Sequence, residues 1–149
     1  MQLSYRRAML ADKAMLLELM AAYYAFDGHH FDAAKSSAVL DEFLADDRFG
    51  LAWLIEVDGA IAGYMALCIG FSLEFGGRDA FVDELYLYEP YRGQGLGRAA
   101  LAHMIAEARR LGIKALHLEV AEDNARARRL YEALGFELRA RFQLMSSSL

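Results

Sequence analysis

The spacing of apolar residues predicts that the chain begins with a strand and two helices. A strand ends at Tyr5–Ala8, and apolar residues then recur every three or four positions from Met15 to Met20, as on one face of a helix that Asp12 can cap. The same spacing predicts a second helix over about Ala34–Leu44. Residues 26–32 break the pattern and are expected to form a loop.

The middle of the chain has the patterning of strands. Two apolar segments, Gly50–Val57 and Ala60–Phe75, are joined at Asp58-Gly59, a dipeptide typical of hairpin turns. The segment Ala80–Tyr88 predicts a third strand, which Pro90 ends.

The last third returns to alternating helices and strands. We expect a helix from about Leu96 to Leu111, a strand over Lys114–Val120, and a helix from about Asn124 to Leu134. Residues Phe136–Met145 predict one or two closing strands. Since neither an internal repeat nor a linker is evident, residues 1–149 are expected to form a single α/β domain.

Composition and charge narrow the functional class. One cysteine, Cys68, excludes an internal disulfide framework and a cysteine-based zinc site. No signal peptide and no apolar run of about 18 residues is evident, so we expect a cytoplasmic protein without a membrane partner. The net charge of −5 argues against nucleic-acid binding. Residues 1–91 carry 6 basic and 15 acidic side chains (−9), and residues 92–149 carry 10 and 6 (+4).

The basic segment opens with a glycine turn between a predicted strand and a predicted helix, Arg92-Gly93-Gln94-Gly95-Leu96-Gly97. Such a turn offers unpaired N–H groups to a phosphate. Residues 95–100 also satisfy the dinucleotide pattern G-x-G-x-x-A, with Glu119 as its acidic residue. That interpretation is physically poor, because only about fifty residues follow and cannot supply the remaining strand–helix units of a dinucleotide fold.

A second motif lies downstream, Asn-Ala-Arg-Ala-Arg-Arg-Leu-Tyr-Glu-Ala-Leu-Gly-Phe, from Asn124 to Phe136. Together with Arg92-x-x-Gly95-x-Gly97, it resembles the GNAT superfamily of acyl-CoA-dependent N-acyltransferases. The resemblance implies a mixed, mostly antiparallel sheet of six to seven strands, splayed at the middle, with helices on both faces. It also implies acetyl-CoA as co-substrate and no metal.

The resemblance implies roles for residues along both motifs. Backbone groups of Leu85 and Leu87 would bind the pantetheine arm, and Asn124 would contact it too. The pyrophosphate would be held by the turn and its neighbours, Arg92, Gly93, Gln94, Gly95, Leu96, Gly97 and Arg98. Tyr131 would lie beside the thioester sulfur.

The chemistry of amine acylation points to further residues. An amine with a pKa of about 10.4 is almost fully protonated at pH 7, so a base must remove a proton. Tyr131 is the candidate donor to the leaving thiolate, and the N–H of Leu87 the candidate oxyanion donor. Glu84 and Glu119 are equal candidates for the base, with Asp83 behind them. By strand alternation, Asp83 and Glu84 are expected on opposite faces.

The acceptor is defined only as a class. We expect a small-molecule or peptide amine, and the acidic first part of the chain favours a cationic one. The loop containing His29 and His30 is the candidate for acceptor specificity; adjacent histidines make a metal site a poor interpretation. Oligomeric state stays open, with a homodimer among the alternatives. The expected function is N-acetyl transfer by direct attack in a ternary complex; the alternative is a non-catalytic CoA-binding sensor or interaction module.

Overall fold

A computed structural model describes all 149 residues. The chain forms two compact units, Met1–Leu118 and Glu119–Leu149. The strands are β1 (Leu3–Arg7), β2 (Gly50–Val57), β3 (Ala60–Ser72), β4 (Gly77–Leu87) and β5 (Ala115–His117). The α-helices are α1 (Lys13–Phe26), α2 (Ala33–Ala45), α3 (Leu96–Arg110) and α4 (Ala125–Ala133), and the short 3-10 helices are η1 (Leu10–Asp12) and η2 (Glu89–Tyr91).

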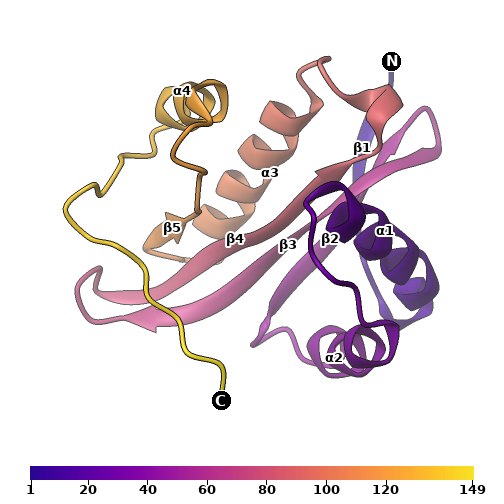
Figure 1. Ribbon diagram of the computed structural model, residues 1–149, viewed down its shortest axis with the longest axis horizontal. Coiled ribbons are helices and arrows are strands. Elements are labelled where there is room, and N and C mark those ends of the chain that lie inside the picture. Colours follow the sequence, from indigo (N-terminus) through magenta and orange to yellow (C-terminus); the bar gives the residue numbers. More distant parts are fainter. The chain divides into compact units, whose positions relative to one another are not determined.

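The first unit is built on one mixed sheet in the order β1-β2-β3-β4-β5 (Figure 1). Strands β1 to β4 run antiparallel, and β5 runs parallel to β4. The turn between β2 and β3 is the predicted Asp58-Gly59 pair, with φ of 50° and 82°. These left-handed values are those of a tight hairpin turn, in which Asp and Gly are favoured.

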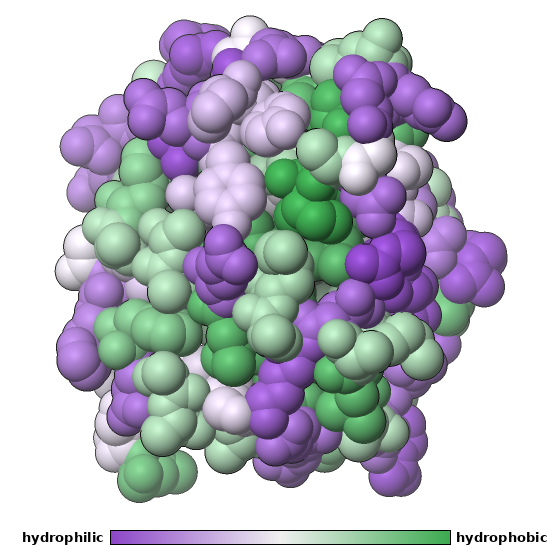
Figure 2. Space-filling view, turned by 90° about the vertical axis from the view of Figure 1, so that its right-hand side faces the viewer, coloured by the Kyte–Doolittle hydropathy of each residue, from purple (hydrophilic) through white to green (hydrophobic).

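Helices cover both faces of the sheet (Figure 1). On one face, α1 and α2 bury Leu19 and Leu40 against Leu54 and Tyr64 of the sheet. On the other face, the ring of His103 from α3 stacks on Tyr5 at 4.3 Å and meets the edge of Trp53. On the side of the molecule where α1 lies, apolar and polar side chains are interspersed (Figure 2).

The sheet has five strands, so the expectation of six to seven is wrong. The predicted strand Lys114–Val120 shrinks to Ala115–His117, and residues 136–145 contain no strand. Alternating apolar residues describe one segment only, whereas a strand also needs a neighbour that accepts and donates its backbone hydrogen bonds. No residue of the second unit belongs to a ladder.

Local signals account for several helix ends. Asp32 caps α2 by accepting a hydrogen bond from the N–H of Lys35 at 3.0 Å, and Gly112 follows α3 with a φ of 75°. Asp12 was expected to cap α1 but makes no such bond; its carboxylate accepts from the N–H of Met9 and pairs with Arg6. In the second unit, Asn124 caps α4 by accepting from the N–H of Ala127 at 3.1 Å.

Candidate active site

The glycine turn lies where the sequence predicts it, immediately before α3. Gly93 and Gly95 have φ values of 74° and 78°, in the left-handed region that glycine adopts without steric cost. A Cβ at either position would meet no atom within 4 Å. These glycines therefore serve the backbone path, and the space beside them is open.

The turn presents a row of unused backbone donors. None of the six N–H groups of residues 93–98 donates a hydrogen bond within the protein, and the first bond of α3 is the one from Ala99 to the carbonyl of Gly95. Leu96 is buried at 2% exposure and anchors the turn to the core. Unpaired N–H groups at a helix N-terminus carry partial positive charge, so this segment is suited to an anion.

Strand β4 exposes a second set of backbone groups beside the turn. The N–H of Tyr88 donates to the carbonyl of Ala62, which fixes the residues that face β3 as 84, 86 and 88. The backbone groups of Leu85 and Leu87 therefore face away from β3. Strand β5 pairs with β4 only from Asp79 to Phe81 and does not reach them. An extended ligand could pair with this free edge as an added strand would.

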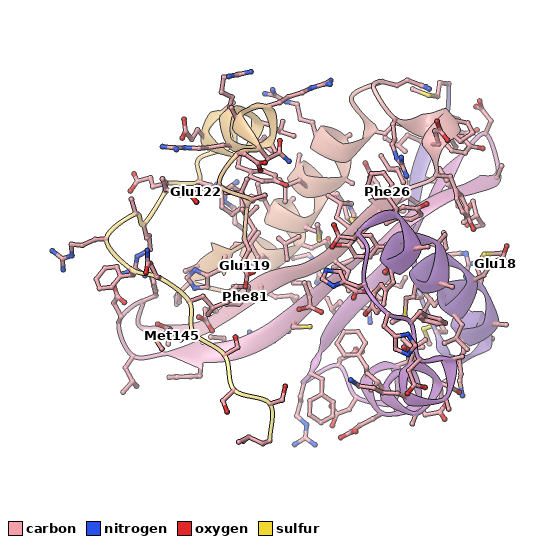
Figure 3. The ribbon with its side chains drawn as sticks, viewed as in Figure 1. Glu18, Phe26, Phe81, Glu119, Glu122 and Met145 are labelled. Carbon is pink, nitrogen blue, oxygen red and sulfur yellow. The ribbon has the colours of Figure 1, made fainter.

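Arg92 connects this edge to the end of α1. Its Nε donates to the carbonyl of Leu87 at 2.9 Å, and its guanidinium lies 4.0 Å from the ring centre of Phe26. Phe26 is the last residue of α1 and lies near the end of β4 (Figure 3). The ring of Tyr86 lies on the same guanidinium at 5.4 Å. The Arg92 side chain therefore has a structural function besides any contact with a phosphate.

Glu84 is a part-buried carboxylate that is held at both of its oxygens. Its Oε2 accepts a hydrogen bond from the hydroxyl of Tyr24 at 2.7 Å, and its Oε1 accepts one from Tyr64 at 2.6 Å. Burial raises the pKa of Glu84, and nearby Asp83 adds to this, while the two tyrosine hydrogen bonds lower it; the net direction is upward. Burial also raises the pKa of both tyrosines, which keeps them protonated as donors.

A β-bulge places Asp83 on the same face as Glu84. Ala66 pairs with Glu84 and Leu67 pairs with Val82, so Asp83 is the extra residue in β4. Burial and then the nearby carboxylates of Asp83 and Glu84 raise the pKa of the Cys68 thiol to about 12. The expectation that Asp83 and Glu84 point to opposite faces is therefore wrong, because simple alternation does not survive a bulge.

The other predicted residues lie in the second unit. Tyr131, on α4, is half-buried beside Phe136, and burial raises the pKa of its hydroxyl. Asn124 uses its side-chain oxygen to cap α4, which leaves its amide nitrogen available. Glu119 is exposed and lies beyond the end of β5, outside any strand. The assignment of Glu119 as an alternative base stays a prediction.

The loop between α1 and α2 contacts the residues that hold Glu84. The ring of Phe31 packs against Tyr24 with 5.6 Å between centroids, and His29 lies 6.5 Å from the same ring. His29 pairs with Asp27 at 2.8 Å. No group of three or more His, Cys, Asp or Glu side chains is arranged to hold a metal ion. The role of this loop in acceptor specificity stays a prediction.

Sequence reasoning missed the part that Tyr24 and Tyr64 play. Neither residue was singled out as part of the site. They lie 60 and 20 residues from Glu84 along the chain, so no local spacing reveals these contacts. The sequence contains one indirect signal, which is an acidic residue inside an apolar strand. Such a residue needs hydrogen-bond partners if it is buried, but the sequence does not show which residues they are.

The sequence profile of the Acetyltransferase (GNAT) family matches residues 13–136. This protein belongs to the GNAT family. A solved structure with the same fold is the integron cassette protein HFX_CASS3 from the mobile metagenome of Cole Harbour Salt Marsh. It is 31% identical, has a TM-score of 0.85, and the match covers 96% of this chain and 89% of that one.

Shorter matches link this GNAT chain to curated relatives. It is 47% identical over 60 residues to the uncharacterized N-acetyltransferase YycN of Bacillus subtilis (strain 168), covering 40% of this chain and 38% of that protein. It is 54% identical over 46 residues to the [ribosomal protein bS18]-alanine N-acetyltransferase of Escherichia coli (strain K12), covering 31% of each. The matched stretches thus span well under half of these relatives. None of the helices is long and apolar enough to cross a membrane.

Proposed function

We propose that this GNAT protein is an N-acetyltransferase that moves an acetyl group from acetyl-CoA to an amine by direct attack in a ternary complex. The observation that carries the proposal is the row of six unused N–H groups at residues 93–98, adjacent to the free backbone edge of β4. We further propose that both units act as one acyltransferase domain, since the family profile runs across their boundary.

The chain's residues fit acetyl-CoA, which supplies the acetyl group as an activated thioester. The N–H groups from Gly93 to Arg98 would bind the pyrophosphate, with the side chains of Arg92 and Arg98 nearby. The backbone of Leu85 and Leu87 would bind the pantetheine arm. Asn124 would contact the same arm through its amide nitrogen.

Glu84 is the proposed base. A carboxyl group whose pKa is raised by burial is a better proton acceptor at neutral pH than an ordinary one. Glu119 is the less favoured candidate, because it is exposed and makes no hydrogen bond that would orient it. Tyr131, whose pKa is raised by burial, would donate its proton to the departing thiolate. The N–H of Leu87 would stabilise the developing oxyanion.

The acceptor is proposed as a small-molecule or peptide amine. The relative from Escherichia coli is named for the alanine of a ribosomal protein, which makes a peptide N-terminus one member of the class to test. Asp83 and Glu84 lie on one face and pair with no basic side chain of the protein, which favours a cationic acceptor. The single free cysteine suits a reducing compartment, so we propose a cytoplasmic location.

A thiol-release assay with acetyl-CoA and a panel of amines and N-terminal peptides tests the proposal. Glu84→Gln should lower kcat by about 100-fold, within the usual range for loss of a general base, and should leave CoA affinity unchanged. Glu119→Gln is the matched control and should retain activity. CoA binding without turnover on any amine would instead indicate the alternative, a sensor or interaction module. If Glu119→Gln abolished turnover and Glu84→Gln did not, the base would be reassigned.

A further inference from the structure

Two tyrosine hydroxyls bind the Glu84 carboxylate, and these contacts indicate a specific role for the two tyrosines. Each carboxylate oxygen accepts one hydroxyl, at 2.7 Å from Tyr24 and 2.6 Å from Tyr64, and no lysine or arginine pairs with the group. Two neutral donors favour the charged form of the carboxylate, and no cation is present that would weaken it as a base.

The two tyrosines come from different parts of the first unit. Tyr64 lies on β3, one strand away from Glu84, and is 1% exposed. Tyr24 lies in the last turn of α1, is only half-buried, and packs against Phe31 of the loop between α1 and α2. One oxygen of Glu84 is therefore fixed to the sheet, and the other is tied to the helix that leads into the predicted acceptor loop.

We propose that Tyr64 and Tyr24 are positioning residues for Glu84: Tyr64 fixes the carboxylate on the sheet, and Tyr24 links its orientation to the acceptor loop. This inference rests on Glu84 being the base of the proposed reaction. Neither tyrosine takes up or releases a proton in the reaction. Each keeps its proton and donates a hydrogen bond to the carboxylate.

The test compares Tyr64→Phe and Tyr24→Phe with the wild-type protein by two measurements. The first is the titration of the Glu84 carboxyl carbon by NMR in the free protein, with Glu84→Gln used to assign the signal. The second is the pH profile of kcat. A hydrogen bond to a charged group contributes about 1.5–3 kcal/mol, and one pKa unit is about 1.4 kcal/mol, so each variant should raise the Glu84 titration midpoint by about one to two pH units.

The acid limb of kcat should move upward with that midpoint. Tyr24→Phe should also raise KM for the acceptor, because it removes the hydrogen bond that links Glu84 to the helix leading into the acceptor loop. Tyr64→Phe should leave KM nearly unchanged. Tyr5→Phe is the matched control: its hydroxyl is buried without a partner, and its ring packs on His103 on the opposite face of the sheet. That variant should move neither measurement.

The outcomes separate this inference from the proposed function. An unchanged Glu84 titration in both variants would overturn the positioning role. A titration that moves while the acid limb of kcat stays in place would also overturn it, since the hydrogen bonds would then not tune catalysis. Full turnover by Glu84→Gln would show that Glu84 is not the base, which contradicts the proposed function. The NMR titration does not depend on turnover, so the two failures can be told apart. If Tyr64→Phe folds poorly, the half-buried Tyr24 still provides both measurements.

Discussion

Replacing Gly95 by alanine tests whether the turn before α3 requires its left-handed backbone. Gly95 has a φ of 78°, and a Cβ there would meet no atom within 4 Å, so the cost of Gly95→Ala comes from the backbone alone. That cost is about 1–2 kcal/mol for a left-handed non-glycine residue. Gly97 lies inside α3 without a positive φ and with equally open space. Gly97→Ala should therefore stabilise the protein, by about 0.5–1 kcal/mol.

Urea unfolding measures both effects. Trp53 is the only tryptophan and is 2% exposed, so its fluorescence reports loss of the core. The free energy of unfolding should fall for Gly95→Ala and rise for Gly97→Ala, with a change in Tm of about 2–4 °C per kcal/mol. If the turn relaxes in the free Gly95→Ala protein, the same cost appears instead as weaker CoA binding, about tenfold for 1.4 kcal/mol, measured by calorimetry.

Two results would refute this reasoning. If Gly95→Ala left both stability and CoA affinity at wild-type values, the left-handed backbone would not matter. Equal destabilisation by Gly97→Ala would show that the methyl group, and not the backbone angle, decides the cost.

Three further predictions concern other parts of the chain. Tyr131→Phe should lower kcat by about 100-fold and keep CoA affinity, as stopped-flow and calorimetry can measure; unchanged kcat would remove Tyr131 as proton donor. Burial lowers the pKa of His103, so the folded protein favours the neutral ring. The free energy of unfolding should therefore be highest above about pH 6.5 and should decline as the pH falls below it, because the unfolded chain then takes up the proton more readily. His103→Phe should flatten this decline in urea unfolding between about pH 7.5 and 5, and an identical decline would contradict the assignment. Gly63→Ala places a Cβ 2.0 Å from the carbonyl oxygen of Tyr86, so thermal unfolding should show a loss of about 3 kcal/mol or more. Gly70→Ala, which meets only the side chain of Asp79, should cost less; equal losses would argue against the backbone clash.

Features encoded by neighbouring residues could be predicted from the sequence. The Asp58-Gly59 turn and the helix after Gly95 each depend on a few adjacent residues, and the structure contains them. Family membership followed for the same reason, because its two motifs are short and local.

Features that depend on distant partners could not be predicted. The hydrogen bonds from Tyr24 and Tyr64 to Glu84 join three separate elements. The bulge at Asp83 arises from the pairing of β3 with β4, not from the composition of either strand. The closing strands predicted over Phe136–Met145 failed in the same way, since an alternating pattern does not supply a pairing neighbour.

Arg92 has a consequence for the affinities of the two proposed substrates. One guanidinium contacts both the end of β4, beside the proposed pyrophosphate site, and Phe26, at the start of the predicted acceptor loop. If a bound phosphate draws this side chain away from Phe26 and thereby alters acceptor affinity, thermodynamic reciprocity requires the acceptor to change the affinity for acetyl-CoA by the same factor. The affinity for either substrate then depends on whether the other is bound.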